Sequence, residues 1–357
     1  MASSTPIDPT APAAPDRGTA FRQLLQAGVA FDPLYPTERF GPLTDHLPMA
    51  LTALHALGAG SAQLQVFRDT YARKLVPMRT AGDADAADRL GVPAAYPALL
   101  ARFEAELAAD GRAAVLARWI PRLIDALAVH ALHPLIRTAA ALEHDVDREL
   151  AAALAYWCSA HMQVPAPRIA RRDLPAETAA ATLFAAVRAH ADGGATPLQA
   201  AGFGSRLLEL AARPGFVDFS GWRPAQLDLA HMAREAARVY LGTGDFFALH
   251  MVTGSHALRC VLPWVADVEG ALDRWWQALA ATYVVIGAPD YQGWQELREP
   301  ARVPDGAAMV RTSMDALAAD DPEHVVKLLW SAREEYAAHG FDEHARIAAR
   351  VCATGRA

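Results

Sequence analysis

The stretch FFALHMVTGSHALR (246–259) carries two histidines, His250 and His256, six residues apart with Thr253 and Gly254 between them. On a regular helix, residues at this spacing point roughly 240° away from each other and cannot share a ligand. Two interpretations follow. Either the helix is intact, with one buried and one surface histidine, or it breaks at Gly254 and both imidazoles reach one centre.

Two other histidines lie where proline interrupts the helical pattern. His46 is at the expected start of a helix, two residues before Pro48, and His133 directly precedes Pro134. Interrupted backbone in apolar surroundings often marks a place where side chains converge. Taken one at a time, each histidine is more often a core residue with a single hydrogen bond.

Lysine is nearly absent from this chain. Among 33 basic residues, only Lys74 and Lys327 are lysines. Lys327 lies in the apolar run HVVKLLW, where a buried charge is costly unless it is neutralised or paired. Unlike arginine, a buried lysine can lose its proton, and a neutral amine can take up carbon dioxide as a carbamate that ligates metal. The alternatives are a side chain that extends to the surface or pairs with Glu323.

Helices must position these residues. Apolar faces with a period of 3.6 residues recur through most of the chain, and strand patterns are nearly absent, apart from a weak candidate at 284–289. The predicted helices are 48–59, 97–109, 113–129, 147–162, 177–192, 225–241, 270–286, 308–319 and 322–339. The fold class is therefore all-α. We expect residues 1–19, rich in Ala, Pro, Ser and Thr, to be a disordered tail, and residues 20–357 to form a single large helical domain.

Composition excludes several classes of function. The net charge of -7 and the lack of a basic stripe argue against nucleic-acid binding. No apolar run approaches the roughly 20 residues needed to span a bilayer, so we expect no membrane association. The three cysteines are scattered, which favours a reducing, cytoplasmic location. The segment GFGSRL (202–207) lacks the third glycine of a dinucleotide fingerprint, so any NADPH requirement would involve a partner reductase.

Four segments, in order along the chain, resemble the questin oxidase-like family: DHLPMAL with His46, HPLIRTAAAL with His133, FFALHMVTGSHALR, and HVVKLLW with Lys327. The family includes enzymes of natural product biosynthesis that open anthraquinone rings. The resemblance implies an all-helical fold with a buried non-haem iron centre. It also implies that dioxygen is used to cleave or oxidise a quinone- or anthrone-type polyketide ring.

The resemblance further implies which residues hold the metal. Four histidines and a carboxylated lysine are expected to bind Fe(II), which here gives His46, His133, His250, His256 and the carbamate of Lys327. Binding by both His250 and His256 requires the helix break at Gly254. Because Pro134 pushes the preceding residue away from helical dihedrals, His130 is a possible substitute for His133.

Other residues are expected around the iron. Met49, Trp157, Phe247 and Trp330 are candidates for apolar walls that hold a flat aromatic substrate. Among catalytic residues, Asp45 and Arg137 are expected to orient ligands and Tyr336, or Glu334, to handle protons.

The expected partners are a small aromatic substrate, dioxygen and, where electrons are needed, an external reductase. The reaction would be that of a dioxygenase or of a Baeyer–Villiger-type monooxygenase. One alternative is a helical zinc- or manganese-dependent hydrolase, although five protein ligands are more than such sites usually have. Another is a non-enzymatic helical binding protein whose histidines are only core residues.

Overall fold

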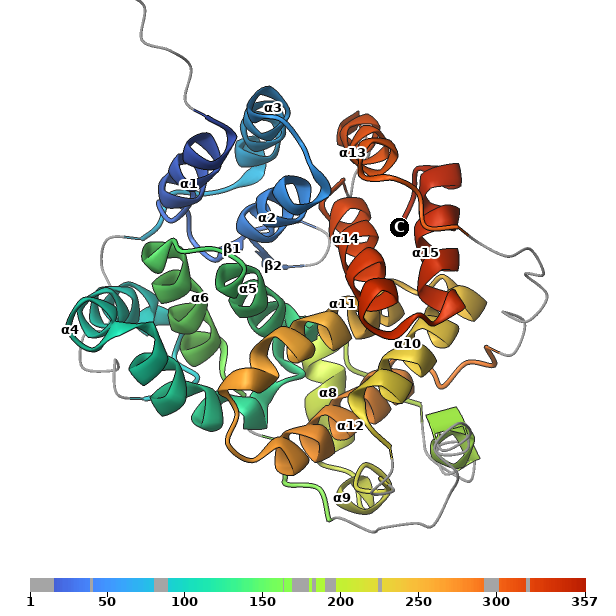
Figure 1. Cartoon of the computed structure of the whole chain (residues 1–357). Coiled ribbons are helices and arrows are strands. Elements are labelled where there is room, and N and C mark those ends of the chain that lie inside the picture. Colours follow the sequence, from blue (N-terminus) through green and yellow to red (C-terminus); the bar gives the residue numbers. More distant parts are fainter. Residues whose placement is uncertain are drawn as a thin grey trace, which may run out of the picture.

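The computed structural model describes residues 16–38, 41–79, 89–162, 164–168, 180–181, 184–189, 197–223, 227–291, 302–318 and 322–357. Within these ranges the chain is almost entirely helical (Figure 1). The strands of the described residues are β1 (Leu34–Tyr35) and β2 (Leu43–Thr44), a short antiparallel pair. The predicted all-α fold is confirmed.

The helices have the following bounds. They are α1 (Arg17–Gly28), α2 (Leu47–Leu57), α3 (Ser61–Tyr71), α4 (Tyr96–Leu123), α5 (His133–Leu142), α6 (Asp147–Ala160), α8 (Phe203–Ala211), α9 (Phe216–Phe219), α10 (Leu229–Thr243), α11 (Phe246–Val261), α12 (Val268–Val285), α13 (Gly306–Asp315), α14 (Pro322–His339) and α15 (Asp342–Thr354). No helix of the described residues is long and apolar enough to cross a membrane.

Four helices form the centre of the molecule. Helix α11 packs against α5 and α14, and α2 also packs against α5 and α14. Other helices surround this group (Figure 1). Helices α1 and α3 pack on α2, α6 packs on α5, α4 packs on the outer side of α6, and α10 packs on α11 and on α15. Most residues of α2, α5 and α11 and the N-terminal part of α14 are buried, which explains why these segments are apolar nearly all round. Polar side chains on them are therefore buried too.

Helix α11 is continuous through Gly254, so the predicted break is wrong. Asp245 caps the helix by accepting hydrogen bonds from the backbone N–H groups of Phe247 and Ala248. Gly254 serves close packing. A Cβ at this position would lie 2.7 Å from a methyl carbon of Leu132 and 2.8 Å from the ring of Trp275. The glycine lets neighbouring side chains approach the helix backbone, and it does not redirect the chain.

The segment before α5 has an unusual backbone. His130, Ala131 and Leu132 all have positive φ angles, of 44°, 53° and 70°. The left-handed region disfavours residues with a Cβ, by about 1–2 kcal/mol each, so three in succession are costly. The surrounding packing must impose this turn, which delivers His133 as the first residue of α5.

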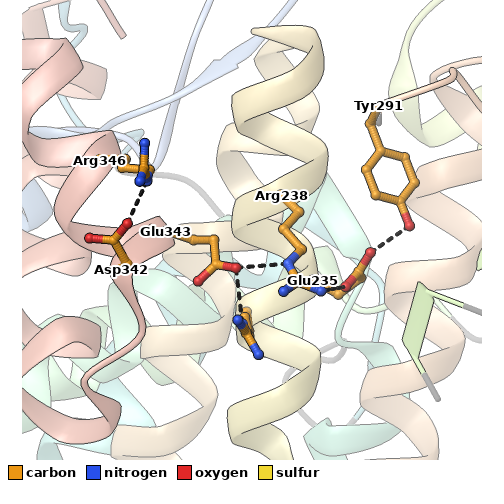
Figure 2. Close-up of polar contacts among 7 residues, drawn as sticks. Glu235, Arg238, Tyr291, Asp342, Glu343 and Arg346 are labelled. Atoms are coloured by element: carbon orange, nitrogen blue, oxygen red, sulfur yellow. Dashed lines mark hydrogen bonds and ion pairs between the residues drawn. The ribbon is translucent and has the colours of Figure 1, made fainter. Parts of the chain in front are cut away.

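An ion-pair network joins α10 to α15 (Figure 2). Glu343 accepts hydrogen bonds from Arg234 at 3.0 Å and from Arg238 at 2.8 Å. Arg238 also pairs with Glu235 at 3.1 Å, and Glu235 accepts a 2.5 Å hydrogen bond from the hydroxyl of Tyr291. Each buried acid in this network faces a cation or a hydroxyl, so the network fixes the two helices together.

Several predicted helices are found within two to four residues of their expected ends. The predicted helices 97–109 and 113–129 correspond to the two parts of α4, which are separated by a kink at Gly111 (φ 78°, ψ 164°). The weak strand candidate at 284–289 is the end of α12 and a turn. Half of the predicted helix 177–192 lies outside the described residues, and its described residues, 180–181 and 184–189, are helical. Residues 1–15 of the predicted tail also lie outside the described residues. Residues 16–19, also expected in the tail, form the cap and first turn of α1.

Candidate metal centre

Four buried histidines meet at the centre of the helical group. His46 precedes α2, His133 begins α5, His250 is one turn into α11, and His324 is in the first turn of α14. Each offers a ring nitrogen, and these nitrogens all lie within 4.8 Å of one another. We call this set the four-histidine cluster.

The ring nitrogens are arranged as metal ligands are. Nε2 of His133 lies 2.7 Å from Nε2 of His46 and 3.1 Å from Nε2 of His250. On the other side of the rings, Nδ1 of His133 donates to the carbonyl of His130 at 2.5 Å, and Nδ1 of His250 donates to the carbonyl of Phe246 at 2.8 Å. A carbonyl only accepts, so both Nδ1 atoms carry the proton. In a neutral ring Nε2 is then a lone-pair acceptor.

Burial keeps these rings neutral. Desolvation lowers the pKa of His250 to about 3, and it lowers the pKa of His46, His133 and His324 well below the ordinary histidine value. Acceptor lone pairs of neutral rings that face each other repel, and a cation between them removes the repulsion. Imidazole nitrogens suit Fe, Cu, Ni and Zn, so the donor set fits a transition-metal ion.

Lys327 lies beside the cluster. It is buried, at 1% exposure, and follows His324 by three residues on α14, which places both on one face of the helix. Its positive charge lowers the pKa of all four cluster histidines. A cationic ammonium at this position would oppose a bound metal ion.

The other lysine of the chain, Lys74, lies near the same four-histidine cluster. Lys74 forms a 3.0 Å ion pair with Glu323, the buried residue next to His324. The Tyr71 hydroxyl lies 3.5 Å from the same carboxylate and 3.3 Å from Nδ1 of His46. Groups that hold the outer nitrogen of a ligating histidine fix its orientation, and sequence reasoning did not identify Tyr71 or Glu323 in this role.

The structure brings together His46, His133 and His250, as expected, but not His256. On the intact helix α11, His256 faces away from the cluster. Its Nδ1 is 3.1 Å from the hydroxyl of Ser331, its ring packs edge-on against Trp330 at 4.6 Å, and burial lowers its pKa to about 3. The prediction of His256 beside the other three is wrong because it required the break at Gly254.

His324 takes the fourth position, and the sequence did offer a signal for it. The residue lies three positions before Lys327 on a helix, so any site that includes the lysine also faces this histidine. His130, the possible substitute for His133, lies outside the cluster. It contributes its carbonyl to His133, while its own Nδ1 is 2.8 Å from the hydroxyl of Tyr156.

The three predicted catalytic residues have different surroundings. Asp45 is fully buried beside His46, where burial raises its pKa to about 7, and it accepts a hydrogen bond from the backbone of Leu47. Arg137 forms a buried two-point ion pair with Glu149 that joins α5 to α6. Tyr336 is 38% exposed and lies twelve residues beyond His324, roughly 18 Å along α14, so it does not reach the cluster.

The predicted substrate-binding residues are also dispersed. Phe247 is partly buried, with its ring centroid 6.3 Å from that of His250. Trp330 packs on His256, and Trp157 donates to the carbonyl of Ala126. Met49 is buried in the first turn of α2. Phe246 was missed: it is 44% exposed, and its ring centroid lies 5.0 Å from that of His250 and 4.7 Å from that of His324.

The fold and site define an all-helical protein with a buried four-histidine centre able to hold a metal. The family model described as questin oxidase-like matches residues 43–332, which include every member of the cluster and Lys327. The chain therefore belongs to the questin oxidase-like family. No curated protein sequence matches it.

Proposed function

We propose that this protein is a non-haem iron oxygenase that uses dioxygen to oxidise or cleave a quinone- or anthrone-type aromatic ring. The observation that carries the proposal is that Nε2 atoms of neutral, buried histidines converge. In His133 and His250, Nδ1 on the other side of the ring donates a hydrogen bond to a backbone carbonyl. The family's name supports an oxidase acting on aromatic polyketides. When bound, Fe(II) supplies the one-electron chemistry with dioxygen that amino-acid side chains lack.

Lys327 is proposed to complete the ligand set as a carbamate. Its neutral amine would add to carbon dioxide, forming a C–N bond and releasing one proton, so that a positive charge beside the metal becomes a negative one. Anionic oxygen attracts a divalent cation, whereas ammonium repels it. The lysine is buried next to four imidazoles, a position where the cationic form is costly.

The residues around the cluster would bind the substrate and exclude water. Phe246 reaches from the surface to the rings of His250 and His324, so it marks the side from which a flat aromatic molecule would approach. The other sides are closed by the apolar faces of α2, α5 and α11. Asp45, with its pKa near 7 and next to His46, is the nearest of the proposed catalytic residues to a ligand.

The source of electrons follows from the substrate. An anthrone or hydroquinone can supply its own, whereas a quinone substrate in a monooxygenase reaction would need NADPH through a separate reductase. A small aromatic molecule and dioxygen are thus the proposed partners in either case. A zinc- or manganese-dependent hydrolase, the alternative, would turn over without dioxygen.

The experiment is dioxygen uptake by the Fe(II)-loaded protein with an anthrone and its quinone, followed by mass spectrometry of products made under isotopically labelled dioxygen. Label in a ring-oxidised or ring-opened product supports the proposal, with two labelled atoms indicating a dioxygenase and one a monooxygenase. Turnover without dioxygen would contradict it. Lys327→Ala should lose activity, and a short carboxylate such as propionate should restore part of it if an anionic oxygen ligand is what the variant lacks.

A further inference from the structure

A second group of metal-ligating side chains lies on the opposite face of α11. His256, Cys260 and Glu143 each offer a ligand atom, and these atoms lie within 4.8 Å of one another. His256 and Cys260 are four residues apart, so they are neighbours on one helix face. Glu143 comes from the C-terminal end of α5, and its carboxylate accepts a hydrogen bond from the Cys260 thiol at 3.4 Å.

The imidazole of this group is already oriented. The Ser331 hydroxyl of α14 lies 3.1 Å from Nδ1 of His256, and the ring of Trp330 packs against it edge-on. Because Nδ1 is occupied, Nε2 is the nitrogen left to face the thiol and the carboxylate. His256 is 3% exposed, whereas Glu143 is exposed and Cys260 partly so. The group is thus anchored in the core and open to solvent on one side.

We propose that His256, Cys260 and Glu143 form a second metal site, which binds a borderline-soft divalent cation such as Zn²⁺ with water as the fourth ligand. A nitrogen, a sulfur and a carboxylate oxygen are the three ligand types of zinc, and three protein ligands leave one position open. Binding would displace the thiol proton that Cys260 now shares with Glu143. Thiolate and carboxylate together balance the charge of the cation.

The positive charges nearby do not oppose this site strongly. Arg259 and Arg333 lie close enough to lower the pKa of His256, and each pairs with an acid. Arg259 pairs with the buried Glu335 at 2.7 Å, and Arg333 pairs with Glu334 at 2.6 Å. The site is separate from the four-histidine cluster, since His256 lies roughly 9 Å along α11 from His250 and on another face. Its occupation would clamp α5 to α11, the helices that carry His133 and His250.

Cobalt titration of the full-length, metal-stripped protein tests the site, because a thiolate bound to Co²⁺ gives a near-ultraviolet charge-transfer band that histidine ligands cannot give. We expect this band in the wild type and its loss in Cys260→Ser. Cys352→Ser is the matched control, since Cys352 is also partly buried and lies on α15, outside the group. That variant should keep the band.

Glu143→Gln provides a second variant at an exposed position that leaves the fold intact, and it should weaken Co²⁺ binding at this site at least tenfold. Zn²⁺ should displace Co²⁺ and abolish the band. A wild-type protein without the band, a band that persists in Cys260→Ser, or equal affinity in Glu143→Gln would overturn the proposal.

Discussion

The ion-pair network between α10 and α15 and the four-histidine cluster are both buried polar regions, but their partners differ. In the network, Glu343 faces two arginines and Glu235 faces an arginine and a tyrosine hydroxyl. In the cluster, Nε2 of His133 lies 3.1 Å from Nε2 of His250, and both nitrogens are acceptors because each Nδ1 carries the proton. The network pairs opposite charges, whereas the cluster brings together groups of the same kind, an arrangement that suits the binding of a cation.

This difference separates buried polar groups that stabilise the fold from buried polar groups that could bind a metal. When one partner of a buried ion pair is removed, the other charge stays buried without it. The folded protein is then destabilised by the full desolvation free energy of that charge. A cluster of neutral imidazoles holds no such pairs of opposite charge, so it contributes less to stability through charge pairing. Changes in the network should therefore alter stability and spare metal binding, and changes around the cluster should do the reverse.

Within the network region, the largest expected effect on stability comes from acid, through His344. His344 is buried on α15, and desolvation lowers its pKa to about 4. Between its unfolded pKa of about 6.5 and this value, the unfolded chain binds a proton that the folded protein does not, so stability falls as the pH falls. The contribution is about 3 kcal/mol. Denaturant unfolding of His344→Leu should show a correspondingly weaker loss between about pH 6.5 and 4; an unchanged loss would contradict a buried neutral ring.

Next in size is Glu343→Gln. The loss of the shared carboxylate leaves Arg234 and Arg238 without their common partner, which should lower the free energy of unfolding by about 2 kcal/mol and leave metal content unchanged. Asp342→Asn is the control on the same helix, because Asp342 is 49% exposed and pairs only with Arg346 among the contacts in Figure 2. Its effect should stay below about 0.5 kcal/mol. Equal effects of the two variants would remove the distinction.

Tyr71→Phe should act on the cluster in the opposite sense. The hydroxyl beside Nδ1 of His46 is lost, so metal affinity should fall about tenfold, with little change in thermal stability. Tyr96→Phe is the matched control, another buried tyrosine, on α4. Competition with a metal-binding indicator measures both affinities, and the same affinity in the two variants would show that Tyr71 does not orient the ligand.

The smallest effect is expected at the left-handed turn before His133. Ala131 has a φ of 53°, so Ala131→Gly relieves backbone strain, while glycine adds entropy to the unfolded chain; the net gain should be about 0.5 kcal/mol. Ala139→Gly, inside α5, should instead destabilise by about 1 kcal/mol. Thermal unfolding of both variants decides whether the turn is strained, and destabilisation by both would mean that it is not.

Much of the fold could be predicted because helical periodicity is a local property. The position of His46 at a helix start followed from Pro48. Pro134 indicated an interruption near His133, but not that His133 begins α5 with helical dihedrals. The exchange of His256 for His324 had one signal in the sequence, the three-residue spacing of His324 and Lys327, but Gly254 pointed to His256 instead. Gly254 looks like a break until the packing of Leu132 and Trp275 against it is known, and that packing is tertiary.

Prediction from the sequence was limited in the same way at the turn formed by residues 130–132. Neither Ala131 nor Leu132 is of a type that favours positive φ, so sequence reasoning could not place the His130 carbonyl behind His133. Proline at 134 indicated an interruption but not its direction. Local patterns located the helices, and the contacts between distant segments decided which side chains meet.

The central claim is that the metal is held by His46, His133, His250 and His324, and not by His256. It is tested most directly by the iron content of wild type, His324→Ala and His256→Ala after anaerobic loading with Fe(II). The account predicts about one iron per chain in wild type and in His256→Ala, and almost none in His324→Ala. Iron retained in His324→Ala and lost in His256→Ala would contradict it.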